Sequence, residues 1–446
     1  MTKVVEVVAV APSSKLLPTQ TLLPLTFFDT LWLRLPPVER VFFYELPHPT
    51  QHFFDEVLPK LKESLAIVLG YFYPLAGHLT WPVDSNKPII KYNTGDTVSL
   101  TVAESDAHFN HLAGTDLCEA TEIRHLVPQL TVSNELANVL SLQVTLFPDS
   151  GFSIGITSHH AVLDGKTSTS FIKSWAYLCN RLGESPCSLP PELRPFYDRD
   201  VIKDPNGFDA KYASDWLKEG GPNNKSLKVW DLQVPEGAIR GVFHLSRKNI
   251  EMLKKLVLAK QKTKVKLHLS TLVVSLAYSS LCKVKAEGIK DKKIELALNI
   301  DCRSRLEPPI PPTYFGNCVG ARFASMETGE LLGEDGLFIA VEAISAALET
   351  LKDGVLSGAE SWSSKLHDGL GTGVKIIGAA GSPWFEVYSS DFGWGRPKKV
   401  EMTSIDRTGA YCLSDTRDGD GIEIGFVSSK GGMEAFSSLF AKGLEY

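Results

Sequence analysis

The chain has 446 residues, which is more than one ordinary hydrophobic core supports and indicates two domains, or three. Its net charge of −6 and pI near 6.0 argue against a nucleic-acid-binding protein, because such binding depends on a broad basic surface. The seven cysteines are scattered and form no CxxC pair, which is typical of reduced thiols in the cytoplasm. No apolar run approaches the ~20 residues of a membrane span. We therefore expect a cytoplasmic protein that binds neither nucleic acid nor membrane.

The first half of the chain alternates strand-like runs with helical periodicity. The apolar run 3–11 is short and contains Glu6, so it predicts a strand and not a signal peptide. Further strands are predicted at residues 41–46, 88–92, 98–103, 139–147 and 152–157. Apolar spacing predicts helices at residues 51–69 and 167–182. These elements indicate a mixed sheet with helices packed on it.

The segment 185–224 is rich in Pro, Gly, Asn and charge, which indicates a crossover between domains. A second set of predicted elements follows, with strands at 241–245, 294–300, 374–380, 399–402 and 422–428 and helices at 247–259, 270–285, 333–356 and 433–441. The chain is therefore predicted to have an α/β fold with two domains, residues 1–190 and 226–446, joined by a crossover loop at residues 191–225.

The candidate functional segment is residues 159–165, with the sequence His-His-Ala-Val-Leu-Asp-Gly. A strand that ends in His159-His160 places an imidazole at the edge of an element, where a substrate can reach it. Histidine can take up and return a proton near neutral pH. Asp164 lies four residues further on, and its role is open at this point. The alternatives are a surface turn, a metal site and a hydrolase. No further cluster of His, Cys, Asp or Glu at ligand spacing accompanies a metal site, and no GxSxG elbow is present for a hydrolase.

Three other segments carry possible chemistry. Eleven lysines lie between Lys254 and Lys293, and they predict either a solvated helix face or a phosphate site near the helix start at Ser270. Arg303 follows a buried-looking strand, where an arginine can pair with a carboxylate from another segment. The Gly-rich run 369–373 precedes a strand and not a helix, so we reject a dinucleotide site. The Asp-Phe-Gly at 391–393 lacks the other kinase loops.

His160-xxx-Asp164 followed by Asp391-Phe392-Gly393-Trp394-Gly395 resembles the paired signature of the plant BAHD acyl-CoA-dependent acyltransferases. The resemblance extends to Leu25-Thr26-Phe27-Phe28-Asp29, to Tyr73-Pro74-Leu75-Ala76-Gly77 and to Arg303, and it covers essentially the whole chain. Tyr314-Phe315-Gly316-Asn317-Cys318 is similar to the branch that acylates (iso)flavonoid and anthocyanin glucosides. The residues from His159 to Lys166 are similar to the corresponding motif of malonyltransferases of that branch.

The resemblance implies two similar-sized domains of the chloramphenicol-acetyltransferase type, with mixed sheets flanked by helices and a channel between the domains. It implies that His160 is the general base and that Asp164 pairs with Arg303. It also implies that Trp384 and Ser382 lie near the thioester carbonyl and that Asp391, Gly393 and Gly395 form a structural loop. The residues expected near CoA are Lys166, Lys266, His268, Ser270, Thr271, Cys302 and Arg303. No metal and no permanently bound cofactor is expected, since acyl-CoA is a co-substrate.

The implied reaction is transfer of an acyl group, with malonyl-CoA as the expected donor, to a sugar hydroxyl of a flavonoid or isoflavonoid glucoside. A malonyl carboxylate needs a cation, and Lys166 is the nearest in sequence. Some malonyl-using relatives carry an arginine where this chain has Ser168, which leaves open an aromatic donor such as coumaroyl- or caffeoyl-CoA. Outside this reaction class, the alternatives are a condensation domain, which also uses HHxxxDG, and a binding protein that kept the fold. We expect a monomer that binds only small molecules.

Overall fold

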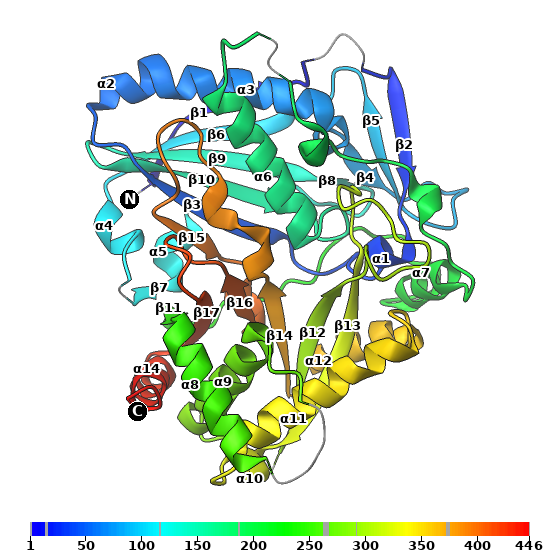
Figure 1. The fold of residues 1–446 in the computed structure, drawn as a ribbon. Helices are drawn as coiled ribbons and strands as arrows, with labels where there is room; N and C mark the ends of the chain where they lie inside the picture. Colours follow the sequence, from blue (N-terminus) through cyan, green and yellow to red (C-terminus); the bar gives the residue numbers. More distant parts are fainter. Residues whose placement is uncertain are drawn as a thin grey trace.

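The computed structural model describes residues 2–13, 17–115, 117–185, 188–261, 267–290, 292–371 and 375–445. Two large mixed β-sheets dominate the described part of the chain, and Figure 1 shows one in the upper and one in the lower half of the view. Each sheet has its own hydrophobic core. The α/β class and the mixed sheets predicted from the sequence are therefore confirmed.

The first sheet contains six strands among the described residues. In spatial order they are β1 (Thr2–Val10), β6 (Val98–Ser105), β9 (Leu140–Phe147), β10 (Gly151–Ser158), β3 (Val38–Glu45) and β15 (Lys399–Met402). Only the β6–β9 pair is parallel. Strands β9 and β10 are buried at every position, because they lie in the middle of the sheet and both of its faces are covered.

The second sheet contains seven strands among the described residues. In spatial order they are β13 (Val319–Glu327), β12 (Lys293–Asp301), β14 (Lys375–Gly381), β16 (Tyr411–Ser414), β17 (Ile422–Ser429), β11 (Ala238–Leu245) and β7 (Cys118–Glu119). β14 runs parallel to both of its neighbours, and the other pairs are antiparallel. β13 was not predicted from the sequence.

The two halves of the chain exchange strands. β15, from the second half, pairs with β3 of the first sheet, and β7, from the first half, pairs with β11 of the second sheet. Buried Arg240 on β11 reinforces this exchange through ion pairs with Glu401 on β15 and with Asp406. The boundaries 1–190 and 226–446 stay a prediction, because neither half builds its sheet alone.

A small sheet and the helices complete the described fold. The small sheet has the order β2 (Gln20–Pro24), β5 (Ile89–Asn93), β4 (His78–Thr80) and β8 (Leu136–Asn138). The helices are α1 (Phe27–Thr30), α2 (Thr50–His52), α3 (Leu58–Tyr71), α4 (Phe109–Leu112), α5 (Ala120–Arg124), α6 (Gly165–Asn180), α7 (Phe208–Lys218), α8 (Arg247–Lys260), α9 (Thr271–Ala286), α10 (Thr328–Leu331), α11 (Gly336–Glu349), α12 (Trp362–Gly371), α13 (Ile405–Thr408) and α14 (Lys430–Lys442). In the described residues, none of them has the length and apolar character that crossing a bilayer requires.

Helices α3 and α6 lie on one face of the first sheet (Figure 1). The predicted helix 51–69 corresponds to α2, a π-helical turn at Phe53–Val57, and α3, which follow one another without a break. The predicted helix 167–182 is confirmed as α6, whose buried side chains include Phe171, Ile172 and Trp175. This helix begins directly after the His160–Asp164 segment, so packing of α6 on the sheet fixes that segment.

The crossover is more ordered than its composition indicates. It contains α7, whose Phe208, Tyr212, Ala213 and Trp216 are buried at helical spacing. The crossover loop predicted at 191–225 therefore contains a helix, because four well-placed apolar residues outweigh the Pro- and Gly-rich flanks. The predicted helix 333–356 is also too long, since α11 ends at Glu349 and a 3₁₀ turn follows.

Candidate active site

The paired histidines follow β10 and have different surroundings. His159 is completely buried, and its Nδ1 accepts a hydrogen bond from the Ala161 N–H at 3.2 Å. Burial, together with neighbouring His160, lowers the pKa of His159 to about 3. His160 is partly exposed, and burial of its imidazole lowers its pKa to about 4. At neutral pH the His160 ring is therefore uncharged and has a lone pair that can accept a proton.

Two contacts hold His160 in place. The indole of Trp32 stacks on the imidazole, with ring centroids 4.5 Å apart and planes 7° from parallel. The Asn317 Nδ2 donates a hydrogen bond to the His160 carbonyl oxygen at 3.0 Å. The His160 Nδ1 is buried and has no hydrogen-bond partner on any other described residue. The ring is therefore held by stacking and by a hydrogen bond to the backbone of His160 itself, and that backbone is held by the Asn317 amide.

Asp164 faces the second half of the chain. It is the N-cap of α6, and its Oδ1 accepts the Thr167 N–H at 2.8 Å. Its Oδ2 accepts the Cys318 N–H at 3.1 Å and lies 2.8 Å from the Arg303 guanidinium. The expected Asp164–Arg303 ion pair is thus present, and its side chains are only 3% and 2% exposed. The carboxylate joins the start of α6 to the second sheet.

Arg303 is the centre of a buried network. Its guanidinium donates to the Thr167 hydroxyl and to the carbonyl oxygens of Tyr314 and Gly316, at 3.0–3.2 Å. Asp301 adds an ion pair to Arg303 at 3.2 Å and one to the Lys166 ammonium at 2.9 Å. Although burial opposes the charge of Arg303, the two carboxylates keep its pKa raised. The structure does not support Arg303 as a CoA contact, because the residue is buried.

Asp29, the last residue of Leu25–Asp29, connects three segments. Its carboxylate is fully buried and accepts hydrogen bonds from the Asn317 N–H at 2.7 Å and from Arg199 at 3.2 Å. Arg199 also donates to the Tyr314 hydroxyl at 2.8 Å. Gly316 has φ +127°, and a Cβ there would lie 2.3 Å from the Arg199 guanidinium, so the position requires glycine. The Tyr314–Cys318 motif therefore builds the wall behind His160.

The remaining residues expected near CoA divide into three groups. Lys266 lies outside the described residues. His268 is exposed, Ser270 caps α9 by accepting the Val273 N–H at 3.3 Å, and Thr271 is the first residue of that helix. The Cys302 side chain is fully buried, and burial raises the pKa of its thiol to about 12. The structure therefore does not support Cys302 as a CoA contact, whereas His268, Ser270 and Thr271 surround a helix N-terminus.

Ser382 and Trp384 lie on a loop beside the start of α6. The Phe385 ring of this loop lies so close to Gly165 that an added Cβ would be 2.7 Å from it. The Ser382 hydroxyl oxygen accepts the Trp384 backbone N–H at 3.3 Å. The Trp384 side chain is 89% exposed. The loop therefore lies against the His160–Asp164 segment, and the Ser382 hydroxyl proton remains available for another acceptor.

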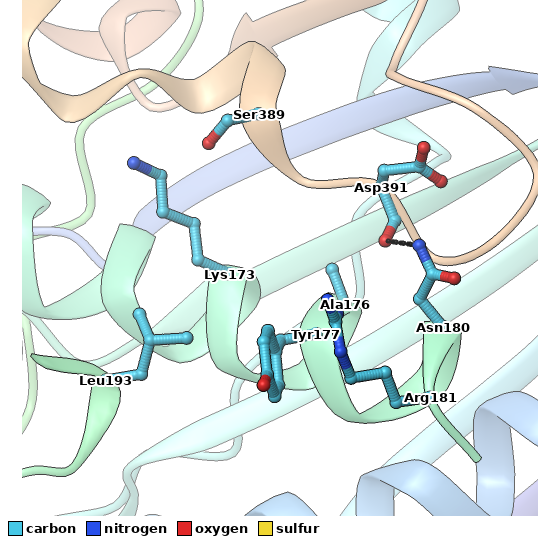
Figure 2. A pocket seen from close by; sticks show the side chains of 8 residues that line it. All are labelled: Lys173, Ala176, Tyr177, Asn180, Arg181, Leu193, Ser389 and Asp391. Atoms are coloured by element: carbon cyan, nitrogen blue, oxygen red, sulfur yellow. Dashed lines mark hydrogen bonds between the residues drawn. The ribbon is translucent and has the colours of Figure 1, made fainter. Parts of the chain in front are cut away.

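The Asp391–Gly395 segment forms a compact loop beside Asn180, at the C-terminal end of α6. The Asp391 Oδ1 accepts the N–H groups of Gly393 and Gly395 at 2.8 and 3.0 Å, and both glycines have positive φ. The Phe392 ring is buried edge-on against Tyr44 and Trp175. These contacts support the structural role expected for Asp391, Gly393 and Gly395. A cavity of about 250 Å³ lies between this loop and α6, lined by Lys173 and Tyr177 but not by His160 (Figure 2).

The sequence analysis did not identify Trp32, Asn317 or Asp301 as parts of the site. Trp32 follows the Leu25–Asp29 motif, Asn317 lies in Tyr314–Cys318, and Asp301 is two residues before Arg303. The sequence signal available was proximity to motifs already noted. The contacts of Trp32 and Asn317 with His160, and of Asp301 with Lys166, join residues far apart in the sequence and could not be read from it. Among the described residues, no group of three or more His, Cys, Asp or Glu side chains is arranged to hold a metal ion.

Two plant acyltransferases align with this chain over nearly its full length. The chain is 40% identical to phenolic glucoside malonyltransferase 1 of Arabidopsis thaliana over 99% of this chain and 98% of that protein. It is 39% identical to agmatine coumaroyltransferase of the same plant, again over 99% and 98% of the two chains. These two relatives differ in both the acyl group and the acceptor that their names give.

The fold comparison agrees with the two-sheet architecture. Vinorine synthase matches with a TM-score of 0.70 at 20% identity, over 98% of each chain. The predicted fold, of two chloramphenicol-acetyltransferase-like units, is consistent with this match. The profile of the Transferase family matches residues 2–442, which is nearly the whole chain. The chain therefore belongs to the Transferase family, the BAHD acyltransferases that its motifs resemble.

Proposed function

We propose that this enzyme transfers a malonyl group from malonyl-CoA to a sugar hydroxyl of a phenolic glucoside of the flavonoid or isoflavonoid type. The observation that carries the proposal is the uncharged, partly exposed imidazole of His160, clamped at the junction of the two halves. Similarity to a phenolic glucoside malonyltransferase over nearly the whole chain supports the choice of substrates.

His160 acts as the general base. A sugar hydroxyl has a pKa far above 7, so it becomes a competent nucleophile only as its proton leaves. The Nε2 of His160 removes that proton while the sugar oxygen attacks the thioester carbonyl. The C–S bond then breaks, and the imidazolium returns the proton to the CoA thiolate. Both substrates react at one base, so no covalent acyl-enzyme is needed.

The negative charge on the tetrahedral intermediate needs a hydrogen-bond donor. We propose the Ser382 hydroxyl and an N–H group of Trp384, because their loop packs against Gly165, next to the His160–Asp164 segment. Since the Trp384 backbone N–H already donates to Ser382, its indole N–H is the candidate on that residue. One such donor contributes about 10²–10³ in kcat in a preorganised site.

Lys166 is our candidate for the malonyl carboxylate. Its side chain is 34% exposed, and its ion pair with Asp301 holds the ammonium at the start of α6. We expect Lys166→Met to raise the KM for malonyl-CoA more than the KM for acetyl-CoA, which carries no carboxylate. Equal changes in the two KM values would contradict this assignment.

The decisive test is a comparison of steady-state rates with malonyl-CoA and coumaroyl-CoA, using a panel of phenolic glucosides as acceptors. We expect a higher kcat/KM with malonyl-CoA, and a preference for coumaroyl-CoA would refute the malonyl assignment. The second candidate, an aromatic acyl transferase, rests on the 39% identity to a coumaroyltransferase and on Ser168 in place of a basic residue. Agmatine belongs in the acceptor panel for this reason.

The role of His160 has its own control. His160→Ala should lower kcat by about 10²–10⁴, the usual contribution of general-base catalysis. His125→Ala removes an exposed histidine away from the site and should leave kcat unchanged. A His160→Ala enzyme with normal rates would exclude the mechanism.

We further propose that the enzyme acts in the cytoplasm as a monomer, with acyl-CoA and the glucoside as its only partners. Six cysteines in the described part of the chain are unpaired, which suits a reducing compartment. Light scattering on the purified enzyme tests the oligomeric state against the 48.9 kDa mass of one chain.

A further inference from the structure

A histidine that acts as a general base usually has its second ring nitrogen bonded to a carboxylate, which orients the ring. Asp164 is the nearest carboxylate in sequence, but it faces away. Both of its oxygens bind the Thr167 and Cys318 N–H groups and Arg303. The His160 Nδ1 has no partner on another residue in the described part of the chain. The imidazole hydrogen-bonds to the backbone of His160 itself, and a contact on the ring face would restrict its plane further.

The indole of Trp32 covers one face of the imidazole. At 4.5 Å between centroids and 7° between planes, the rings are stacked in parallel. Rotation of the imidazole about its Cβ–Cγ bond would break this contact, so the stack restricts the ring plane. Asn317 meanwhile fixes the carbonyl of His160. The stack fixes the plane of the ring, and the hydrogen bond of the ring to the backbone of His160 itself fixes the direction in which Nε2 points within that plane.

Trp32 is itself rigidly placed. Its side chain is 9% exposed and packs with Phe27 and Phe28 in the core of the second sheet. Its backbone N–H donates to the Asp29 carbonyl at 3.1 Å. The Asp29 carboxylate binds the Asn317 N–H at 2.7 Å. Asp29 therefore holds both Trp32 and Asn317, the two residues that contact His160.

We infer that Trp32 is a positioning residue for the catalytic base, whose indole face sets the plane of the His160 imidazole. This inference rests on the proposed role of His160, but not on the identity of the acyl donor or the acceptor. It assigns a function to the segment after the Leu25–Asp29 motif: that segment delivers an aromatic surface to the base.

Two substitutions of Trp32 separate stacking from general packing. Trp32→Phe keeps an aromatic face, and kcat should stay within about threefold of wild type, whereas Trp32→Leu should lower kcat by about 10- to 100-fold through misalignment of Nε2. The KM values for acyl-CoA and glucoside should change by less than about twofold in both, since Trp32 positions the base and not the substrates. Trp81→Leu is the matched control, because Trp81 is a buried tryptophan that follows β4 in the small sheet, outside the site. Its kcat per folded enzyme should be unchanged.

Wild-type kcat in Trp32→Leu, corrected for the folded fraction, would overturn the inference. So would an equal loss in Trp32→Phe and Trp32→Leu. If Trp32→Leu does not fold, the imidazole resonances of wild-type enzyme labelled with ¹³C-histidine provide the test. Stacking predicts a ring-current upfield shift of the His160 signal, assigned by its absence in His160→Gln, and an unshifted signal would overturn the inference. If Trp32→Leu has wild-type kcat and His160→Ala is inactive, this inference alone is refuted. If His160→Ala is fully active, the proposed mechanism is refuted.

Discussion

Replacing Asp164 with asparagine distinguishes a structural carboxylate from a catalytic one. The aspartate accepts from Thr167 on one oxygen and from Cys318 and Arg303 on the other. An amide has one oxygen, so in either orientation its NH₂ group faces a donor. The substitution also leaves Arg303 in a site where it is 1% exposed, with only Asp301 to balance its charge. Removing one partner of a buried pair costs about 3–5 kcal/mol.

This cost converts into a measurable melting shift. At about 2.1 cal/mol/K per residue, unfolding the 446 residues has an entropy of about 0.9 kcal/mol/K. The expected decrease in Tm for Asp164→Asn is therefore roughly 3–5 °C. Scanning calorimetry at pH 7 measures it, alongside kcat on the same preparation. His160→Gln is the comparison, because it should lose activity with little change in Tm.

A double-mutant cycle with Arg303→Met tests the physical cause. If the unpaired guanidinium destabilises Asp164→Asn, removing it in the double variant should restore part of the lost stability. A Tm of Asp164→Asn within about 1 °C of wild type, with kcat lost, would refute the reasoning, because a shift that small falls below the expected cost of a buried unpaired charge. That result would give Asp164 a direct role in the reaction.

Three further outcomes follow from the structure. Asp391→Ala removes the acceptor of the Gly393 and Gly395 N–H groups, and it should lower the free energy of unfolding by about 1–3 kcal/mol in urea titrations. A loss of kcat without that decrease would contradict a structural role for Asp391. Burial lowers the pKa of His160 to about 4, so the unfolded chain binds more protons than the native one as the pH falls from about 6.5 to 4, and native stability is lost over that window. His160→Gln should reduce the slope of the unfolding free energy against pH in this window by up to ~1.4 kcal/mol per pH unit. Equal slopes in the variant and the wild type would show that the imidazole is not buried. Arg240→Met removes the ion pair of buried Asp406 and leaves buried Glu401 with only Lys399, and it should cost about 3–5 kcal/mol in the same titration. Lys62→Met, which breaks a part-exposed pair with Glu6, should cost less than about 1 kcal/mol.

Periodicity in the sequence predicted the long, regular elements. The helix expected at 167–182 is α6, because its apolar periodicity continues over several turns, and the short apolar run 3–11 is β1. α7 was missed since its four buried residues lie between Pro- and Gly-rich flanks. The position of β15 in the first sheet could not be predicted. Its four residues pair with β3, which is far away in the sequence, and no local pattern specifies that partner.

The site shows the same division between local and spatial information. His160 and Asp164 were identifiable because they lie four residues apart in one motif, and Arg303 because of its strand and the family resemblance. Cys302 stays a prediction as a CoA contact, although its side chain is buried, because the sequence marks the segment around Arg303 but not the direction in which each side chain points. Trp32 could not be assigned from sequence, as stacking on His160 depends on the packing of α1 against another core.

The packing of α1 also explains why the base depends on both halves of the chain. His160 ends a strand of the first sheet, yet Trp32, which stacks on it, belongs to the core of the second sheet. Asn317, which binds its carbonyl, and Arg303, which binds Asp164, come from the second half as well. An imidazole attached to one core and oriented by the other has its catalytic geometry only while the two cores are docked. Partial separation of the cores would release the ring before either sheet unfolds, so heat should abolish the proposed transferase activity below the temperature at which the secondary structure melts.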